Sequence, residues 1–186
     1  MNISPDEAAL SLATIETTQR QSLSRRSYRN AAPFVIGWAL VWAVGYTGTA
    51  TLPIADSNRL WIALILIMTV STAILIRRRA GRHASWPGIL TYTVLPAFTI
   101  ILVVNLIAWM FDIHSMIGIS ALFCLLVAAA YVASGLRFGI RYTGIGLALM
   151  ALTGAGLALL PQGQKFDIFV LDAAILMAAG LWFRRA

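Results

Sequence analysis

The sequence predicts an all-α, polytopic membrane protein with six transmembrane helices and both termini in the cytoplasm. Three observations carry this prediction: 60% of the 186 residues are hydrophobic, only 11% are charged, and the apolar residues gather in six long blocks. A soluble domain carries about 25% charged and 45–50% apolar residues, so an ordinary soluble globular protein is excluded. The mean hydropathy of +0.82 points the same way.

The six apolar blocks define the expected helices. Each approaches the length of about 20 residues that a helix needs to cross a hydrocarbon core of about 30 Å. In chain order they cover residues 32–52, 60–76, 88–111, 116–135, 140–160 and 166–183. We therefore expect a cytoplasmic amphipathic helix with a basic linker at residues 1–30, and a six-helix transmembrane domain at residues 31–186. The loops leave no room for a soluble catalytic or DNA-binding domain, so we expect any soluble activity to come from a partner.

The positive charges predict the orientation. Twelve of the 14 basic residues fall on the side that carries both chain ends, namely Arg20, Arg25, Arg26, Arg29, Arg77, Arg78, Arg79, Arg82, Arg137, Arg141, Arg184 and Arg185. Only Arg59 and Lys165 fall on the other side. Because basic loops stay in the cytoplasm, this predicts a bacterial inner-membrane protein with both termini inside. We expect this face to contact anionic lipid headgroups, and we expect no direct binding of nucleic acid.

The N-terminal segment has the pattern of a helix start. Ser4 suits the N-cap, Pro5 suits the first helical position, and Glu7 completes a capping box. The segment is too polar to span a membrane, and Leu12 and Ile15 indicate a modest apolar face. We expect the helix to lie along the headgroups, to pack on the loop after the second block, or to bind a protein. The candidate partner-binding residues are Leu12, Ile15, Glu16, Arg20, Arg77, Arg78 and Arg79.

Two of the first three blocks carry packing signals of their own. Trp38, Trp42 and Tyr46 are spaced by four residues and therefore share one face of the first span. An aromatic stripe inside a span favours packing between helices over a ligand site. Pro96 predicts a bend in the third span, because proline removes a backbone hydrogen bond.

The last two blocks are rich in small residues. Residues of this kind recur four apart in the pairs Gly144/Ala148, Ala151/Ala155 and Ala174/Ala178. This spacing lets a neighbouring helix backbone approach closely. We expect the fifth span to be a central packing helix or the face of a homodimer.

A layer of polar residues crosses the predicted spans. Counting about 1.5 Å per residue along each helix places five of them at a similar depth: Asp172, Asn105, Ser120, Thr153 and Tyr46. A charged Asp near mid-membrane costs about 2.5–3.5 kcal/mol, so Asp172 should face the bundle. Two interpretations stay open. Either these residues line a ligand pocket open to the periplasm, with Asp112 and His114 near its mouth, or they hydrogen-bond between helices as packing contacts.

The sequence lacks the patterns of an enzyme. No phosphate-binding loop is present, because the glycines of the fifth block are not followed by Lys-Ser or Lys-Thr. Ser134 resembles a membrane serine protease nucleophile, but Val132 stands where that motif needs glycine, and no histidine lies within a span to act as its base. His83 and His114 fall in loops on opposite sides of the membrane. We expect no catalytic residue, metal or cofactor, and we interpret Cys124 as a small packing residue.

The N-terminal motif carries a family resemblance. The motif consists of Ser4, Pro5, Glu7 and Ala8, with Ile15 a few residues on. Together with the arginine-rich stretch and the membrane helices that follow, it resembles small six-helix bacterial inner-membrane proteins. The resemblance covers residues 4–30 and the topology. It implies that the partner is a winged-helix transcription regulator encoded beside the membrane protein.

Two functions from different classes follow. The first is a non-catalytic inner-membrane sensor or anchor that binds a cytosolic partner, such as a transcription regulator, through its N-terminal helix and basic face. The second is a small transporter or channel with a periplasm-facing polar pocket around Asp172 and Asn105, because polar residues and broken helices mark permeation pathways. A helper subunit that packs on another membrane protein through the fifth span is a third interpretation.

Overall fold

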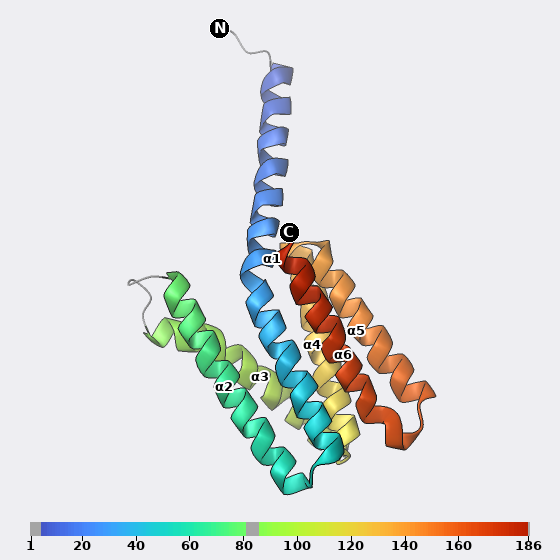
Figure 1. Ribbon diagram of the computed structural model, residues 1–186. Coiled ribbons are helices and arrows are strands. Elements are labelled where there is room, and N and C mark those ends of the chain that lie inside the picture. Colours follow the sequence, from blue (N-terminus) through green and yellow to red (C-terminus); the bar gives the residue numbers. More distant parts are fainter. Residues whose placement is uncertain (1–4, 81–85, 186) are drawn as a thin grey trace.

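The chain folds into α-helices joined by short turns (Figure 1). A computed structural model describes residues 5–80 and 86–185. Within them lie α1 (Pro5–Thr51), α2 (Ile54–Ala80), α3 (Trp86–Met110), α4 (Met116–Phe138), α5 (Ile140–Leu159) and α6 (Lys165–Arg184), with a 3-10 turn, η2 (Gln162–Gln164), before α6. The predicted all-α class and the six helices are confirmed for this part of the chain.

Among the described residues, five helices are long and apolar enough to cross a membrane. They contain the stretches Leu10–Thr51, Ile54–Arg79, Met116–Phe138, Ile140–Leu159 and Lys165–Arg184. The described part of α3 adds a shorter apolar stretch, Phe98–Met110. These lengths fit a multi-pass membrane protein, as the apolar blocks predict.

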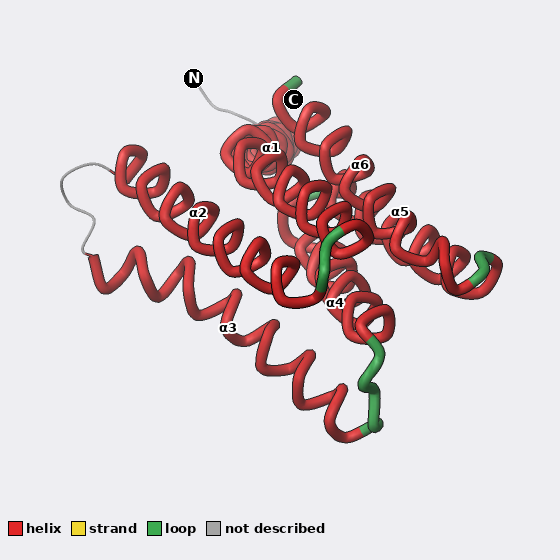
Figure 2. The backbone as a smooth tube through the Cα atoms, turned by 60° about the horizontal axis from the view of Figure 1, so that its bottom comes forward, coloured by secondary structure: helices red, strands yellow, loops and turns green. Residues whose placement is uncertain are grey.

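Four helices form the body of the molecule. α1 packs most extensively against α6, α4 packs against α5, and α5 also contacts α6. α2 and α3 lie to one side of this body (Figure 2), where α2 contacts α1 and α3 contacts α4. Many large apolar side chains of α2 point outward, among them Ile62, Leu66, Ile67 and Val70. Such an outer surface suits contact with lipid rather than with water.

Glycines let the helices of the body come close. A Cβ at Gly180 of α6 would lie 2.5 Å from the Ile36 side chain of α1, and a Cβ at Gly146 of α5 would lie 2.5 Å from the carbonyl oxygen of Ala128 in α4. The small-residue pairs named from the sequence lie elsewhere, because Gly144, Ala148, Ala151, Ala155, Ala174 and Ala178 are all exposed. The fifth span therefore packs inside the chain through the opposite face, which carries Gly146. The homodimer through the outer face stays a prediction.

α1 is a single helix of 47 residues. The residues expected to form a basic linker are helical, so α1 runs on from the expected cytoplasmic helix into the first predicted span. Figure 1 shows the N-terminal part of α1 projecting well beyond the other helices. Every residue from 10 to 23 whose side chain is described is exposed, and we call residues 10–23 the arm. Pro33 lies inside α1 near the point where the arm meets the body, and Figure 1 shows the helix changing direction there.

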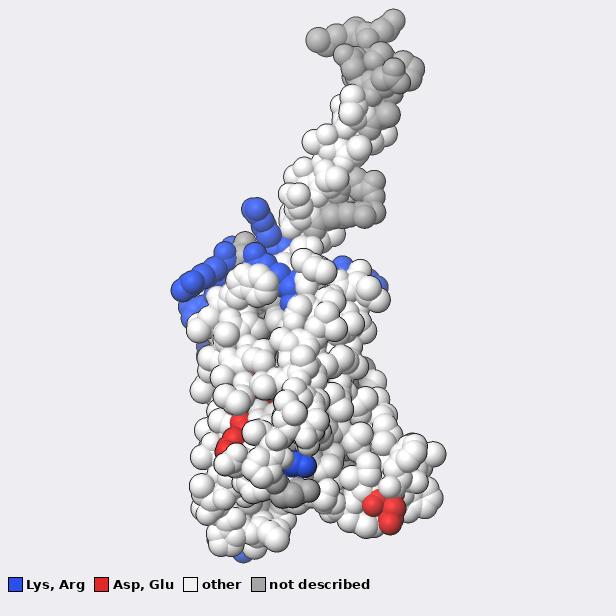
Figure 3. Space-filling view, turned by 90° about the vertical axis from the view of Figure 1, so that its right-hand side faces the viewer, with Lys and Arg blue, Asp and Glu red and all other residues white. Residues whose placement is uncertain are grey.

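Charge is distributed unevenly along the molecule. Figure 3 shows most basic side chains at the level where α1 leaves the body, and the acidic side chains in view lie toward the other end. The arginines at that level come from α1, from the end of α2, from the turn between α4 and α5, and from the end of α6. This arrangement is the one that the six-span topology predicts. The orientation in a membrane stays a prediction.

Candidate functional site

A buried polar cluster lies in the centre of the body. It contains Asp172 of α6, Thr153 of α5, Tyr46 of α1, and Ser120 and Cys124 of α4, and we call it the Asp172 cluster. Four of the five residues are the predicted ligand-binding candidates from those helices. Asp172 and Thr153 are both 0% exposed. The depth count along the helices therefore brought together residues from four separate spans.

Asp172 has one strong contact in this cluster. The Thr153 hydroxyl donates a hydrogen bond of 2.7 Å to Oδ2 of Asp172. Oδ1 of Asp172 is buried and has no hydrogen-bond partner among the described residues. A buried acceptor without a partner costs about 1–3 kcal/mol. Only one of the two carboxyl oxygens therefore accepts a hydrogen bond among the described residues. Buried polar groups that serve packing alone are usually fully hydrogen-bonded.

Tyr46 joins this polar cluster to an aromatic one. Its hydroxyl lies 3.7 Å from the Cys124 sulfur. Its ring packs against Trp61 and Phe169, with ring centres 5.1 and 4.8 Å away, and edge-on against Trp42 at 6.0 Å. The stripe of Trp38, Trp42 and Tyr46 therefore serves packing, as its spacing predicts. Cys124 is buried in the core and also contacts the Tyr46 hydroxyl. Because Cys124 follows Ser120 by four residues, the two side chains share one face of α4, and this spacing could have placed Cys124 in the cluster.

Asn105 does not reach the Asp172 cluster. Its side chain is exposed on α3, and its amide donates a 2.8 Å hydrogen bond to the carbonyl oxygen of Ile101 on the same helix. α3 makes no contact with α6 among the described residues. Asp112 and His114, expected at the mouth of the pocket, form an exposed pair 2.8 Å apart in the turn before α4. The structure therefore does not assemble the periplasm-facing pocket from these residues.

The predicted partner-binding residues fall in two places. Leu12 and Ile15 are 67% and 61% exposed on the arm, whereas the side chains of Glu16 and Arg20 lie outside the described residues. Arg77, Arg78 and Arg79 end α2 and are exposed. Arg79 donates a 2.7 Å hydrogen bond to the carbonyl oxygen of Asn30 and lies over the ring of Phe34. The end of α2 is thus attached to α1 below the arm.

The junction between arm and body is built from aromatic side chains. Tyr28 of α1 packs against Tyr142 of α5 and Phe183 of α6, with ring centres 5.3 and 5.0 Å away. The guanidinium of Arg141 lies over the Tyr28 ring at 5.1 Å. Gly139, with φ of 124°, makes the turn between α4 and α5, and a Cβ there would overlap the Tyr28 hydroxyl. The turn therefore needs glycine both for its backbone and for its contact with α1.

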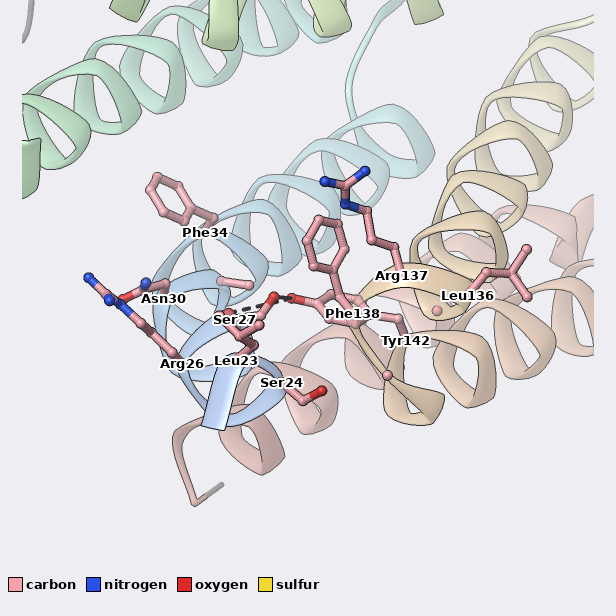
Figure 4. Close-up of a pocket in the computed structure, with 13 residues that line it drawn as sticks. Leu23, Ser24, Arg26, Ser27, Asn30, Phe34, Leu136, Arg137, Phe138 and Tyr142 are labelled. Carbon is pink, nitrogen blue, oxygen red and sulfur yellow. Dashed lines mark hydrogen bonds between the residues drawn. The ribbon is translucent and has the colours of Figure 1, made fainter. Parts of the chain in front are cut away.

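A cavity of about 860 Å³ lies beside this junction. One wall comes from α1, with Leu23, Ser24, Arg26, Ser27, Asn30, Ala31 and Phe34; the other comes from the α4–α5 turn, with Gly135, Leu136, Arg137, Phe138, Gly139 and Tyr142. Figure 4 shows the Tyr142 hydroxyl meeting Ser27 between the two walls, at 3.2 Å. The walls are joined by residues 115 positions apart in the sequence. No sequence pattern pairs them, so only the fold reveals this site.

No protein-family model, curated protein or solved structure matches this chain. The resemblance to small inner-membrane proteins with a regulator partner stays a prediction.

Proposed function

We propose that this protein is a non-catalytic membrane anchor and sensor that presents its N-terminal helix to a cytosolic protein. One observation carries the proposal: the arm continues α1 beyond the body with Leu10, Leu12, Ile15 and Leu23 between 60 and 70% exposed. Exposed leucine and isoleucine on a helix are the anchors that a partner's apolar groove recognises. A cytosolic protein is the expected partner because the arm projects from the basic end of the molecule (Figure 3).

The direction of the arm supports one of the three roles considered for it. A helix that runs on from a membrane span points away from the membrane, so lying flat along the headgroups is disfavoured. The arm also projects past the end of α2 (Figure 1) rather than folding back onto it. At about 1.5 Å per residue, the 14 residues of the arm extend about 20 Å. This length is enough for a groove that takes four helical turns.

The same helix offers a route from the membrane to the partner. α1 contacts Arg79 of α2, the aromatic junction at Tyr28, and the Asp172 cluster through Tyr46. A change in the body that moved α1 would move the arm with it. The resemblance of the N-terminal motif to small inner-membrane proteins favours a transcription regulator as this partner.

The test is co-purification with the full chain. We expect Leu12→Asp combined with Ile15→Asp to lose a soluble partner that the unchanged protein retains in mild detergent, as measured by quantitative mass spectrometry. Thr14→Asp combined with Thr18→Asp is the matched control, because it adds the same two negative charges at other exposed arm positions. A truncation should stop before Ser24, since Tyr28 is buried in the body.

Two outcomes would overturn this proposal. One is equal partner recovery from the Leu12/Ile15 variant and the unchanged protein. The other is the absence of any arm-dependent partner after purification from native membranes.

Transport is the second candidate, and the buried carboxyl of Asp172 favours it. An acidic group in the bundle with an oxygen lacking a partner is a common feature of proton and cation pathways. We expect a transporter to show substrate-dependent flux in proteoliposomes that Asp172→Asn abolishes while the protein remains folded. Loss of the folded protein in Asp172→Asn, with no flux by the unchanged protein, would identify Asp172 as a packing contact instead.

A further inference from the structure

The cavity between α1 and the α4–α5 turn has the chemistry of an anion site. Arg26 and Arg137 come from its two opposite walls (Figure 4), and no Asp or Glu lines it. Ser24, Ser27 and Asn30 add hydroxyl and amide donors along the α1 wall. Guanidinium groups form paired, charge-assisted hydrogen bonds with phosphate oxygens. Figure 4 shows the guanidinium groups of Arg26 and Arg137 pointing in different directions, so the lining suits an anionic headgroup that meets either arginine at the rim of the cavity.

The rest of the cavity is apolar. Leu23, Ala31 and Phe34 belong to the α1 wall, and Leu136 and Phe138 to the other wall. Leu136 is 89% exposed, so this apolar surface continues to the outside of the molecule. The volume of about 860 Å³ falls within the range of about 300–1,000 Å³ typical of pockets for drug-sized ligands. A free phosphate ion would leave most of it unfilled.

The position of the cavity agrees with its lining. It lies at the basic end of the body, where the predicted topology places the cytoplasmic headgroup layer. Basic pockets between transmembrane helices at this level bind anionic lipid headgroups. The apolar walls would then run along an acyl chain while the arginines hold the headgroup.

We propose that this cavity is a specific binding site for the phosphate group of an anionic phospholipid. The site connects α1 to the α4–α5 turn at the base of the arm. Leu23 is the one arm residue that lines it, and the Leu12/Ile15 variant leaves Leu23 unchanged, so the two proposals are tested at different residues.

The test measures lipid retention by the full chain. The protein is delipidated in a neutral detergent and titrated with phosphatidylglycerol or with zwitterionic phosphatidylcholine, and bound lipid is counted by native mass spectrometry. We expect phosphatidylglycerol to be retained in preference to phosphatidylcholine. Arg26→Gln combined with Arg137→Gln should weaken phosphatidylglycerol binding about 10-fold or more, because each arginine supplies charge-assisted hydrogen bonds.

Two variants separate the cavity from the general basic surface. Arg78→Gln combined with Arg185→Gln removes the same charge from exposed positions outside the cavity and should leave binding unchanged. Ser24→Trp fills the cavity without removing charge and should reduce binding as strongly as the Arg26/Arg137 variant. Equal losses from both arginine pairs would mean binding to the basic surface as a whole and would overturn the proposal.

The source of the phosphate is tested by competition. Inorganic phosphate should not displace phosphatidylglycerol at millimolar concentration, because it lacks the tail that the apolar walls contact. Displacement by inorganic phosphate alone would assign the site to a free anion and overturn the lipid assignment. Neither result bears on partner recovery by the arm, so the two proposals fail separately.

Discussion

The two parts of α1 show how the same helix behaves with and without tertiary contacts. From Tyr28 to Tyr46 the helix contributes Ala32, Val35, Ala39, Val41 and Trp42 to the buried core. In the arm, by contrast, all described side chains are exposed, including those of leucine and isoleucine. Both parts are helical, so the difference in burial comes from contacts with other helices and not from helix formation.

The packed part of α1 contributes to stability, whereas the arm presents its apolar side chains at the surface. A helix of this length in water is only marginally stable without packing, so the arm depends on its continuity with the packed part for much of its order. Its apolar residues contribute nothing to the core of this chain and are free for another molecule. Four substitutions test this division between the packed part of α1 and the arm.

Gly180→Leu should be the most damaging of the four changes. The new side chain would have to occupy the space of Ile36 and the α1 backbone, and overpacking a tight interface costs about 1–3 kcal/mol or more. We expect a clear loss of thermal stability in detergent, measured by circular dichroism. Ala178→Leu on the exposed face of α6 is the control and should change little. Equal stability of both variants would show that α1 and α6 are not closely packed.

Thr153→Val tests whether the body also depends on its buried polar contact. The change removes the hydroxyl that donates to Asp172, and a buried carboxyl left without this partner should cost about 1–3 kcal/mol. Thr99→Val is the control, because Thr99 is exposed and its hydroxyl donates to the Leu95 carbonyl of its own helix. The free energy of unfolding from denaturant titration measures both. A Thr153→Val protein as stable as the control would mean that the Asp172 contact is dispensable.

Tyr142→Phe tests the junction between the two parts of α1. The tyrosine hydroxyl lies 3.2 Å from that of Ser27, and its loss should cost about 0.5–1.5 kcal/mol. The aromatic contacts with Tyr28 and Phe183 remain, so the fold should persist. Tyr131→Phe removes a hydroxyl that forms no hydrogen bond among the described residues. If both variants lose the same stability, the Ser27 contact is not the cause.

Ile15→Ser should have the smallest effect. The residue is 61% exposed, and exposed substitutions usually stay within about 0.5 kcal/mol. Hydrogen exchange on the unchanged protein sharpens the contrast, because amides of residues 10–23 should exchange far faster than those of residues 32–46. Slow exchange in the arm of the isolated protein would contradict the view that it lacks contacts there.

Four of the five residues predicted for the polar layer lie in the Asp172 cluster, and Asn105 does not. Counting residues along a helix gives the depth of a side chain, so residues at one level were correctly grouped. Depth carries no information on rotation about the helix axis. Asn105 is exposed on α3, whereas Thr153 and Asp172 face each other in the core.

The small-residue pairs show the same limit of a sequence pattern. Spacing by four finds one face of a helix, but α5 has small residues on two faces. The face that packs within the chain carries Gly146, and the face with Gly144 is exposed. Choosing between them requires knowing which neighbour α5 contacts.

The helical class, the ends of α3 to α6 to within three residues, and the clustering of basic residues at one end follow from the sequence alone. They do so because a long apolar stretch needs removal from water whichever neighbour it meets. The tertiary structure alone decided how each helix is rotated, that α1 continues as one helix past the body, and that its base meets the α4–α5 turn. These features depend on contacts between residues as much as 115 positions apart, and no local pattern encodes which distant side chain will fill a given gap.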